Sequence, residues 1–282
     1  MPKRLESFIT NKYRDEFESW MIRRKYYDNP TAYNNSHSHY RADIRDKNTN
    51  EIIGKVILSC VADYRELRGE DWDIVLKNDS VSEIKFLKKL CSISGADDYY
   101  YAEATKSGVH FQLETVERHV LNEYKDKLEG SERNVYLCAF PFYVKVHENM
   151  NAVNGNDTSC IEFSKKFAAR ASALNLLRET DEMDEFHTYF FGKVSDIKEV
   201  VLDVCSEDIE FLIVTVLSGM GEMPVAMSKE VFDLEGLKVG CMLELKAYVK
   251  ADFLSCEEWI PDQSLLDELY WDDWGRCQNR FD

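Results

Sequence analysis

The residues of this sequence that come nearest to a catalytic pattern are Asp73, Glu83 and Lys85. In metal-dependent nucleases, two carboxylates hold Mg²⁺ and a lysine helps to activate the attacking water. That chemistry requires the glutamate and the lysine, two residues apart, to lie on one face of a strand. Asp73, Glu83 and Lys85 therefore define one enzymatic hypothesis, a metal-dependent nuclease.

The local sequence around Glu83 argues against this hypothesis, because it predicts a helix rather than a strand. Ser80 and Glu83 have the spacing of a capping box, which satisfies backbone N–H groups of a first helical turn. The apolar residues that follow recur at helical spacing: Ile84, Leu87, Leu90 and Cys91. We therefore expect a helix over residues 80–91, on which Glu83 and Lys85 do not share a face.

Other patterns that could carry chemistry are weak. His37 and His39 could present two imidazoles on one side of a strand, but no third ligand follows at a diagnostic spacing. The sequence has no dinucleotide-binding glycine motif, no P-loop and no G-x-S-x-G elbow. Its eight cysteines are widely spaced without a CxxC pair, which is typical of a reduced intracellular protein. We expect no catalytic residue, no bound metal and no cofactor.

Composition indicates a globular protein with a strong negative charge. The 282 residues are 44% hydrophobic and 12% aromatic, and the net charge is −17. Such a charge repels nucleic acid at long range and favours solubility or basic partners. The apolar runs are too short to cross a bilayer, and the first residues lack the apolar segment of a signal peptide. We therefore expect a cytoplasmic protein without membrane contact.

Changes of composition along the chain predict an α+β fold in four parts. Residues 1–150 mix helical and strand patterns, and residues 151–185 read as a helical connector. Residues 186–254 read as a small β-barrel, and residues 255–282 as an acidic, tryptophan-rich tail with a helix. No internal repeat is evident.

Within the first part, helical periodicity also covers residues 5–25 and 115–130. Alternating or continuous apolar residues predict strands at four places: residues 40–64, 71–76, 97–115 and 134–147. Pro141 lies inside the last of these runs, and proline cannot donate a hydrogen bond to a neighbouring strand. We therefore expect an edge strand or a β-bulge at Pro141.

Residues 186–254 read as three strands, a short connector and a fourth strand. The fourth strand alternates, with Leu243 and Leu245 on one side and Glu244 and Lys246 on the other. Gly240 lies just ahead of this strand and predicts a turn with a positive φ angle.

This series resembles an OB-fold, a five-stranded Greek-key barrel that binds oligonucleotides, oligosaccharides or proteins. The residues that carry the resemblance are Gly192-Lys193-Val194, Pro224-Val225, Ser228-Lys229-Glu230 and Leu237-x-Val239-Gly240. OB-folds that hold single strands use aromatic platforms beside a basic groove. The resemblance therefore implies these outward-facing candidates: Tyr189, Phe191, Lys193, Lys246, Tyr248 and Lys250.

The acidic tail supplies a second set of candidate contacts. Residues 255–282 combine eight carboxylates and two arginines with Trp259, Trp271 and Trp274. Tryptophan often dominates interface energies, and an acidic aromatic helix suits a groove on a basic partner. The alternative is a terminal helix over residues 264–271 that docks on the chain's own core.

These observations predict a non-enzymatic intracellular binding or adaptor protein. Its OB-like region would engage a protein, including a basic one, or a single-stranded nucleic acid. One alternative is an acidic inhibitor or immunity-type protein that covers a basic surface or mimics nucleic acid. The other alternative is the metal-dependent nuclease built on Asp73, Glu83 and Lys85.

Overall fold

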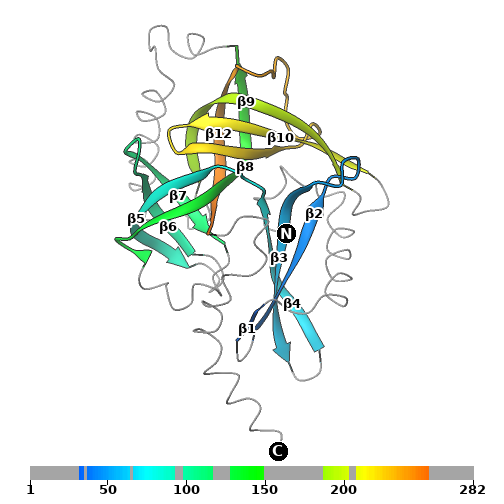
Figure 1. The fold of residues 1–282 in the computed structure, drawn as a ribbon, viewed down its shortest axis with the longest axis vertical. Helices are drawn as coiled ribbons and strands as arrows, with labels where there is room; N and C mark the ends of the chain where they lie inside the picture. The colour runs from blue at the N-terminus through cyan, green and yellow to red at the C-terminus, as the bar shows by residue number, and fades with distance from the viewer. Residues whose placement is uncertain are drawn as a thin grey trace, which may run out of the picture.

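The computed structural model of the chain is built almost wholly from β-strands (Figure 1). The described residues are 32–34, 37–63, 66–92, 98–116, 128–148, 187–202 and 208–253. They form twelve strands and no helical element. In this part of the chain no helix has the length and hydropathy needed to span a bilayer.

The predicted α+β class is therefore wrong for the described residues. The clearest local error is at residues 80–91, where the expected helix is the strand β5 (Val81–Ser92). The helices expected in residues 5–25, 151–185 and 264–271 lie outside the described residues, as does most of the one expected at 115–130.

The first four strands form an antiparallel sheet of their own, in the order β1-β2-β3-β4. Their bounds are Ala32–Asn34 for β1, His37–Arg45 for β2, Ile52–Asp63 for β3 and Glu66–Leu76 for β4. The strands predicted within residues 40–64 and 71–76 are thus confirmed. We call this unit the N-terminal sheet; it extends downward on the right of Figure 1.

The other eight strands close into a barrel in the order β10-β11-β8-β5-β6-β7-β12-β9. Besides β5 they are β6 (Asp98–Ala104), β7 (Val109–Thr115), β8 (Glu132–His147), β9 (Thr188–Leu202), β10 (Ile209–Ser218), β11 (Gly221–Met227) and β12 (Met242–Asp252). The barrel therefore takes strands from before residue 150 as well as from residues 186–254, to which the sequence prediction had confined it.

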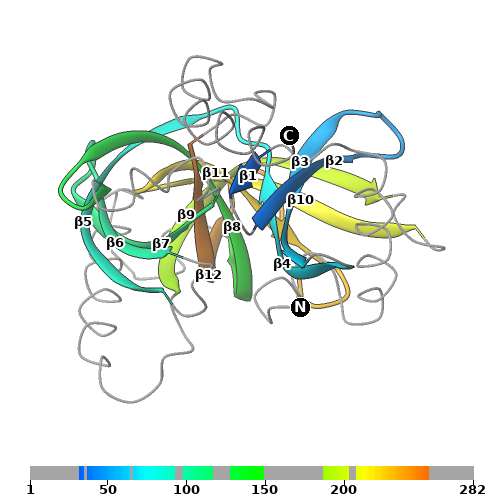
Figure 2. The ribbon, with the colours of Figure 1, turned by 90° about the horizontal axis from the view of Figure 1, so that it is seen from below.

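An extra pairing between β8 and β12 crosses this barrel and divides it into two rings. The two strands are antiparallel from the pair Met242–His147 to the pair Asp252–Tyr136. One ring consists of β5, β6, β7, β12 and β8, and the other consists of β9, β10, β11, β8 and β12. Figure 2 shows β8 and β12 in the middle, with β5, β6 and β7 to one side.

The two rings repeat the same arrangement. In each ring three antiparallel strands follow one another along the chain. The third strand then lies parallel to a shared strand, β7 to β12 in one ring and β11 to β8 in the other. Each unit ends in a long strand that belongs to both rings.

The turns that lead into the two shared strands confirm this equivalence. The N–H of Gly130 donates to the Phe86 carbonyl at 2.6 Å, and the N–H of Gly240 donates to the Val194 carbonyl at 2.9 Å. Both glycines have positive φ angles, 81° and 92°, as the sequence predicted for Gly240. Residues 81–147 and 188–252 are therefore two copies of one structural unit, which the sequence had not revealed.

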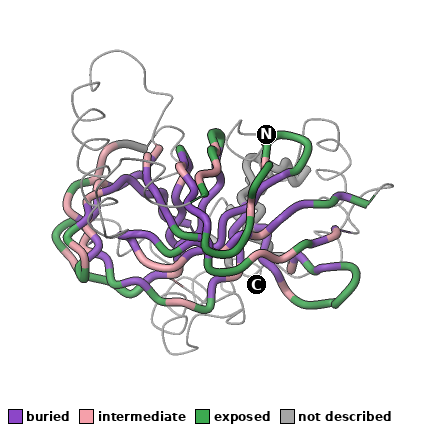
Figure 3. The backbone as a smooth tube through the Cα atoms, turned by 90° about the horizontal axis from the view of Figure 1, so that it is seen from above, coloured by how far each residue is buried: buried purple, intermediate pink, exposed green. Residues whose placement is uncertain are grey.

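A continuous apolar core fills both rings. It includes Phe86, Phe111 and Phe190, all at most 1% exposed, and it passes between the rings through Ala139 and Val249. Ala139 and Val249 pair with each other within the β8–β12 ribbon. Figure 3 shows this buried backbone running through the centre of the barrel.

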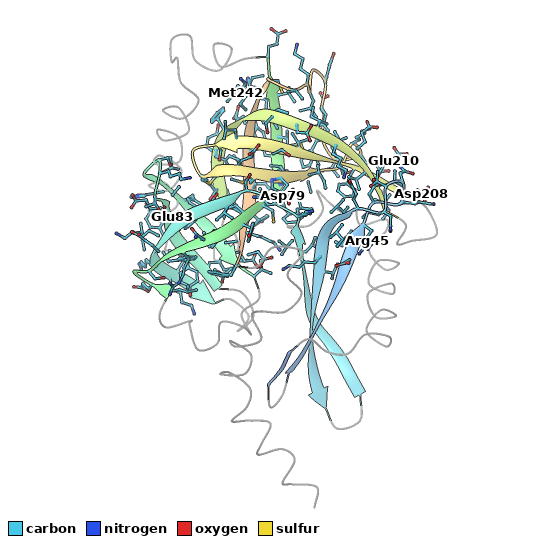
Figure 4. The ribbon with its side chains drawn as sticks, viewed as in Figure 1. Arg45, Asp79, Glu83, Asp208, Glu210 and Met242 are labelled. Atoms are coloured by element: carbon cyan, nitrogen blue, oxygen red, sulfur yellow. The ribbon has the colours of Figure 1, made fainter. Side chains whose placement is uncertain are left out.

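A second apolar cluster joins the N-terminal sheet to the outside of the barrel. Ile44, Val56 and Ile74 of the sheet pack with Phe140 and Phe211 of the barrel. The turn after β2 adds polar contacts, because the Asp46 carboxylate accepts hydrogen bonds from the Thr49 hydroxyl at 2.7 Å and the Val201 N–H at 3.2 Å. These contacts hold the end of the sheet against β9, near Arg45 and Asp208 in Figure 4.

One buried ion pair also crosses this junction. The Lys55 ammonium of β3 lies 2.7 Å from the Asp252 carboxylate of β12, and the two side chains are only 4% and 1% exposed. Two further charged residues of the barrel, Glu114 and Lys250, are buried as well. The N-terminal sheet therefore contacts the end of β12, at Asp252.

Candidate functional site

The beginning of β12 presents its polar side chains on the outer side of the barrel, beside β9 and β8. Leu243 and Leu245 point into the core, so the alternation directs Glu244 and Lys246 outward. The same rule applies to the neighbouring strands, whose core residues include Phe190 and Val144. We define the tyrosine–lysine face as the outward residues of these three strands: Tyr143, Lys145, His147, Tyr189, Phe191, Lys193, Glu244, Lys246 and Tyr248. Met242, labelled in Figure 4, marks the start of β12 at this face.

The pairing register places Lys246 between two tyrosines. Lys246 pairs with Tyr189 on one side and with Tyr143 on the other. Its ammonium nitrogen lies 5.5 Å from the centroid of the Tyr143 ring and 6.0 Å from that of the Tyr189 ring. Both distances allow cation–π attraction, which holds the lysine among the rings while it remains exposed to solvent.

Glu244 occupies the next row and ties the rings together. Its Oε1 accepts a hydrogen bond from the Tyr189 hydroxyl at 2.6 Å and a long one from the Tyr143 hydroxyl at 3.4 Å. Its Oε2 lies 2.9 Å from Nε2 of His147. One carboxylate thus orients side chains from all three strands.

These contacts shift the pKa values of the groups involved. Burial alone would raise the pKa of the Glu244 carboxyl, but hydrogen bonds from Tyr189 and His147 outweigh burial, and the pKa lies below its ordinary value of 4.5. Burial, together with the adjacent Glu244 carboxylate, raises the pKa of the Tyr189 and Tyr143 hydroxyls above 10.0. Both tyrosines therefore stay neutral donors while Glu244 stays ionised.

A β-bulge pushes one further aromatic ring out beside this face. Residues on either side of Phe142 pair with β12, and the register shifts between Lys246 and Ala247, which pairs with Pro141. The bulge predicted at Pro141 is thus confirmed. The Phe142 ring is 44% exposed and lies 5.4 Å from the Tyr248 ring. It extends the aromatic surface along β8.

The residues predicted as binding candidates fall into three groups. Tyr189, Lys193, Lys246 and Tyr248 lie together on the tyrosine–lysine face, whereas Phe191 lies in the same rows but is only 1% exposed. Lys250 is fully buried, with its nitrogen 5.2 Å from the centroid of the Phe140 ring. The three tryptophans, Trp259, Trp271 and Trp274, lie outside the described residues.

Sequence reasoning missed the contribution of β8 and the role of Glu244. Tyr143, Lys145 and His147 alternate with Val144 and Val146, which is the signal of a strand with one polar face. That signal predicts that β8 has one polar face, but it does not predict which strand lies beside β8. The antiparallel pairing of β8 with β12 brings together residues about a hundred positions apart, and no local pattern indicates that partner.

The residues of the nuclease hypothesis are divided between two strands that belong to different sheets. Glu83 and Lys85 do lie on the same side of β5, in contrast to the predicted helix, and Figure 4 shows Glu83 on the β5 side of the barrel. Asp73 belongs to β4 of the other sheet. Among the described residues, no three histidine, cysteine, aspartate or glutamate side chains gather in a way that could hold a metal ion.

Comparison with protein families, with characterised proteins and with solved structures finds no match for this chain. The resemblance of residues 186–254 to an OB-fold therefore stays a prediction. Any function has to be argued from the tyrosine–lysine face itself.

Proposed function

We propose that this chain is a non-enzymatic binding protein that holds a single-stranded nucleic acid on the tyrosine–lysine face. The observation that carries the proposal is the row Tyr189, Lys246 and Tyr143, in which one cation lies between two aromatic rings. Bases stack on such rings regardless of their sequence, and a lysine beside them contacts phosphate. Exposed Phe142 lengthens the platform.

The repeated unit provides an internal comparison that supports this role. In the first unit, the pair Val81–Tyr136 occupies the position that Tyr189–Lys246 occupies in the second unit. Glu83 and Asn134 likewise stand where the second unit has Phe191 and Glu244. By the same register Lys85 stands where the second unit has Lys193, so the first unit keeps one lysine and one tyrosine but has no lysine between two rings. Stability of the fold therefore does not account for Tyr189 and Lys246.

Local charge on the face favours an anionic ligand. Lys145, Lys193 and Lys246 contribute three exposed cations, whereas the Glu244 carboxylate is held by tyrosine and histidine hydrogen bonds. The net charge of −17 opposes binding of a polyanion at long range. Affinity should therefore be modest and should fall steeply with added salt.

The same net charge favours a second candidate, a protein partner with a basic surface. Such a partner would be attracted to the acidic body of the molecule and could bury the exposed Phe142 ring. It would use the tyrosines as interface anchors, a role for which tyrosine is well suited. This version keeps the same face but changes the ligand.

Titration of the full chain with fluorescent oligothymidylate and oligouridylate tests the nucleic-acid version. Tyr143→Ala should weaken binding by about 1–3 kcal/mol, roughly 5- to 150-fold, because one stacking ring is lost. Lys246→Ala should weaken binding and reduce the slope of log affinity against log salt by about 0.7.

The first repeat offers control positions on the other ring. Val81 and Lys85 are the first-unit equivalents of Tyr189 and Lys193, and Val81→Ala and Lys85→Ala should leave binding unchanged. An absence of binding by the unmodified chain to both DNA and RNA at low salt would remove the nucleic-acid version. Loss of binding in the Val81 and Lys85 variants as well would show that the face is not the site.

A further inference from the structure

We propose that His147 adds a proton-dependent positive charge to the tyrosine–lysine face, so that the face binds an anionic ligand more tightly as the pH falls. The proposal rests on the proposed binding role of that face and adds a regulation of it. Nε2 of His147, at the end of β8, lies 2.9 Å from Oε2 of Glu244 on β12. Protonation of the imidazole turns this hydrogen bond into an ion pair, which is stronger.

The pairing register places His147 close to the lysines of the face. Met242 pairs with His147 on one side and with Lys193 on the other, so the three residues form one row across β8, β12 and β9. Lys145 lies two residues before His147 and therefore projects from the same side of β8. Two strand spacings are about 10 Å, roughly one Debye length at 0.1 M salt. A phosphate held by either lysine therefore feels the charge of the imidazole.

The pair of His147 and Glu244 lies partly enclosed on the face. The two side chains are 10% and 16% exposed. The centroid of the Phe191 ring lies 6.4 Å from that of the imidazole. Partly buried charges are screened less by salt than exposed ones, so a charge gained here acts on a ligand bound beside it.

The other titratable groups of the face keep their charge between pH 5.5 and pH 8. Burial raises the pKa of Glu244, but hydrogen bonds from Tyr189 and His147 outweigh burial, so the pKa lies below 4.5 and the carboxylate stays ionised. Burial and the Glu244 carboxylate raise the pKa of the Tyr143 and Tyr189 hydroxyls above 10.0, so both stay neutral. Lysine side chains are charged throughout this range. The titratable groups that β8, β9 and β12 present beside His147 on this face are Tyr143, Lys145, Tyr189, Lys193, Glu244 and Lys246.

Histidine is the side-chain type whose charge changes in this range of pH. Three lysines and one carboxylate give the face a charge of +2 while His147 is neutral, and a proton on His147 raises it to +3. An anion on the face then favours the proton, and the proton favours the anion by the same factor. We expect this factor to be about tenfold at low salt, within the usual range of coupling between two sites.

Titration of the full chain with fluorescent oligothymidylate at pH 8.0 and pH 5.5, at constant ionic strength, tests the proposal. Neither thymine nor the phosphodiester changes its charge in this range. The affinity at pH 5.5 should exceed that at pH 8.0 about tenfold, and the slope of log affinity against log salt should steepen by about 0.7. His147→Gln keeps an N–H donor for Glu244 but cannot gain a charge, so most of this ratio should be lost. His147→Lys is charged at both pH values and should also show a small ratio.

His110 provides the matched control, because its Nε2 lies 3.5 Å from Oε2 of Glu103 on the other ring. The chain has six histidines, and all of them make the protein less negative as the pH falls. His110→Gln removes one of these charges away from the face and should keep the ratio of the unmodified chain. A ratio for His147→Gln equal to that for His110→Gln would overturn the proposal.

NMR of the histidine rings in the unmodified, ¹⁵N-labelled chain gives a second test that needs no variant to bind. The His147 signal is identified by its absence from the spectrum of His147→Gln. Because proton and ligand favour each other, saturating oligothymidylate should move the titration of His147 to higher pH and leave that of His110 in place. An unchanged His147 titration in the bound chain would overturn the proposal.

Dextran sulfate separates this inference from the proposed function, because it is a polyanion without bases and its sulfates do not titrate in this range. Oligothymidylate binding that requires Tyr143 but has the same pH ratio in His147→Gln and the unmodified chain would overturn the inference and keep the nucleic-acid role. Dextran sulfate binding with a His147-dependent ratio, and no oligothymidylate binding at either pH, would keep the inference and remove that role. Dextran sulfate binding with equal ratios in both chains would again overturn the inference.

Discussion

Glu244 is the residue on which the geometry of the tyrosine–lysine face depends. Its carboxylate holds Tyr189 of β9 and His147 of β8 at 2.6 and 2.9 Å. Without that acceptor the hydroxyls of Tyr189 and Tyr143 lose their hydrogen bonds to Glu244, and the rings gain rotational freedom. A stacking surface is useful only when its rings are already in place, so Glu244 acts as a positioning residue.

Glu244→Gln should lower stability at neutral pH by about 1–2 kcal/mol, because a charged acceptor becomes a neutral one. The folded pKa lies below the ordinary 4.5, so ionised Glu244 adds stability above pH 4.5 that disappears as the pH falls through the folded pKa. Urea unfolding over a series of pH values should therefore separate the two proteins at pH 7, and the difference should shrink progressively as the pH is lowered below 4.5.

The exposed Glu210 provides the control for this experiment. Glu210→Gln should follow the unmodified protein at both pH values. An equal pH dependence in the Glu244 variant and the unmodified protein would contradict the stabilising role of the carboxylate.

At the scale of single elements, β5 explains why local rules failed. Its buried residues are Ser82, Ile84 and Phe86, which alternate with exposed Val81 and Glu83 as in any half-buried strand. The same stretch also has apolar residues at helical spacing, so its period is ambiguous. Pairing with β6 and β8 decides the outcome, and such tertiary contacts are invisible in a local window.

The supposed capping residue has another partner. The Ser80 hydroxyl donates to the Glu222 carboxylate of β11 at 3.2 Å rather than to a group within a helical turn. By contrast, β9 to β12 were predicted as strands, and β12 alternates over residues 243–249 in a way that has no helical counterpart. A stretch whose apolar residues fit only the spacing of a strand was therefore predicted correctly from sequence. A stretch whose apolar residues fit both a strand and a helix was not.

At the scale of single elements, the turns at Gly130 and Gly240 allow a prediction about stability. Gly130→Ala and Gly240→Ala should each destabilise the protein by about 1–2 kcal/mol, the cost of a Cβ atom at positive φ. No other heavy atom lies within 4 Å of the added Cβ at either site, so the whole effect comes from the backbone. Urea unfolding measures both values.

Asparagine tolerates this conformation better than alanine, and Gly130→Asn and Gly240→Asn should cost less. Because the two glycines are equivalent in the repeat, the same substitution should lower the stability equally at both sites. A large cost at one glycine and none at the other would contradict that equivalence.

At the scale of the whole molecule, the chain is a repeat whose two units share their long strands. The sequence did not reveal it because equivalent positions carry different residue types, such as Val81 against Tyr189 and Asn134 against Glu244. What the units share is backbone geometry and inward apolar residues, which many sequences satisfy. Tyr189 and Lys246 were nevertheless predicted to face outward, from the alternation of their strands together with the OB-fold resemblance. Lys250 came from the same reasoning but is buried, at the end of β12 where Asp252 contacts Lys55 of the N-terminal sheet.

The buried ion pair between Lys55 and Asp252 lets us predict how strongly the contact between the N-terminal sheet and the barrel affects the stability of the protein. Asp252→Ala or Lys55→Met should each cost about 3–5 kcal/mol, because either change leaves a buried charge without its ionic partner. The double change Lys55→Met with Asp252→Leu should be less destabilising than either single change. Thermal or urea unfolding of the three variants measures this coupling.

Lys229 and Glu199 form an exposed ion pair whose side chains are 45% and 75% exposed, and they serve as the control. Lys229→Met should cost about 0–1 kcal/mol. A double variant at Lys55 and Asp252 whose loss equals the sum of the two single losses would contradict the coupling.

The shared strands also bear on how the molecule is made. Because β12 completes both rings, neither ring can close while residues 242–252 are still inside the ribosome. Contacts such as that between Glu114 and Lys250 join distant parts of the chain and give a high contact order, which slows folding. The nascent chain therefore exposes open strand edges throughout its synthesis, a period in which chaperones protect such chains from aggregation.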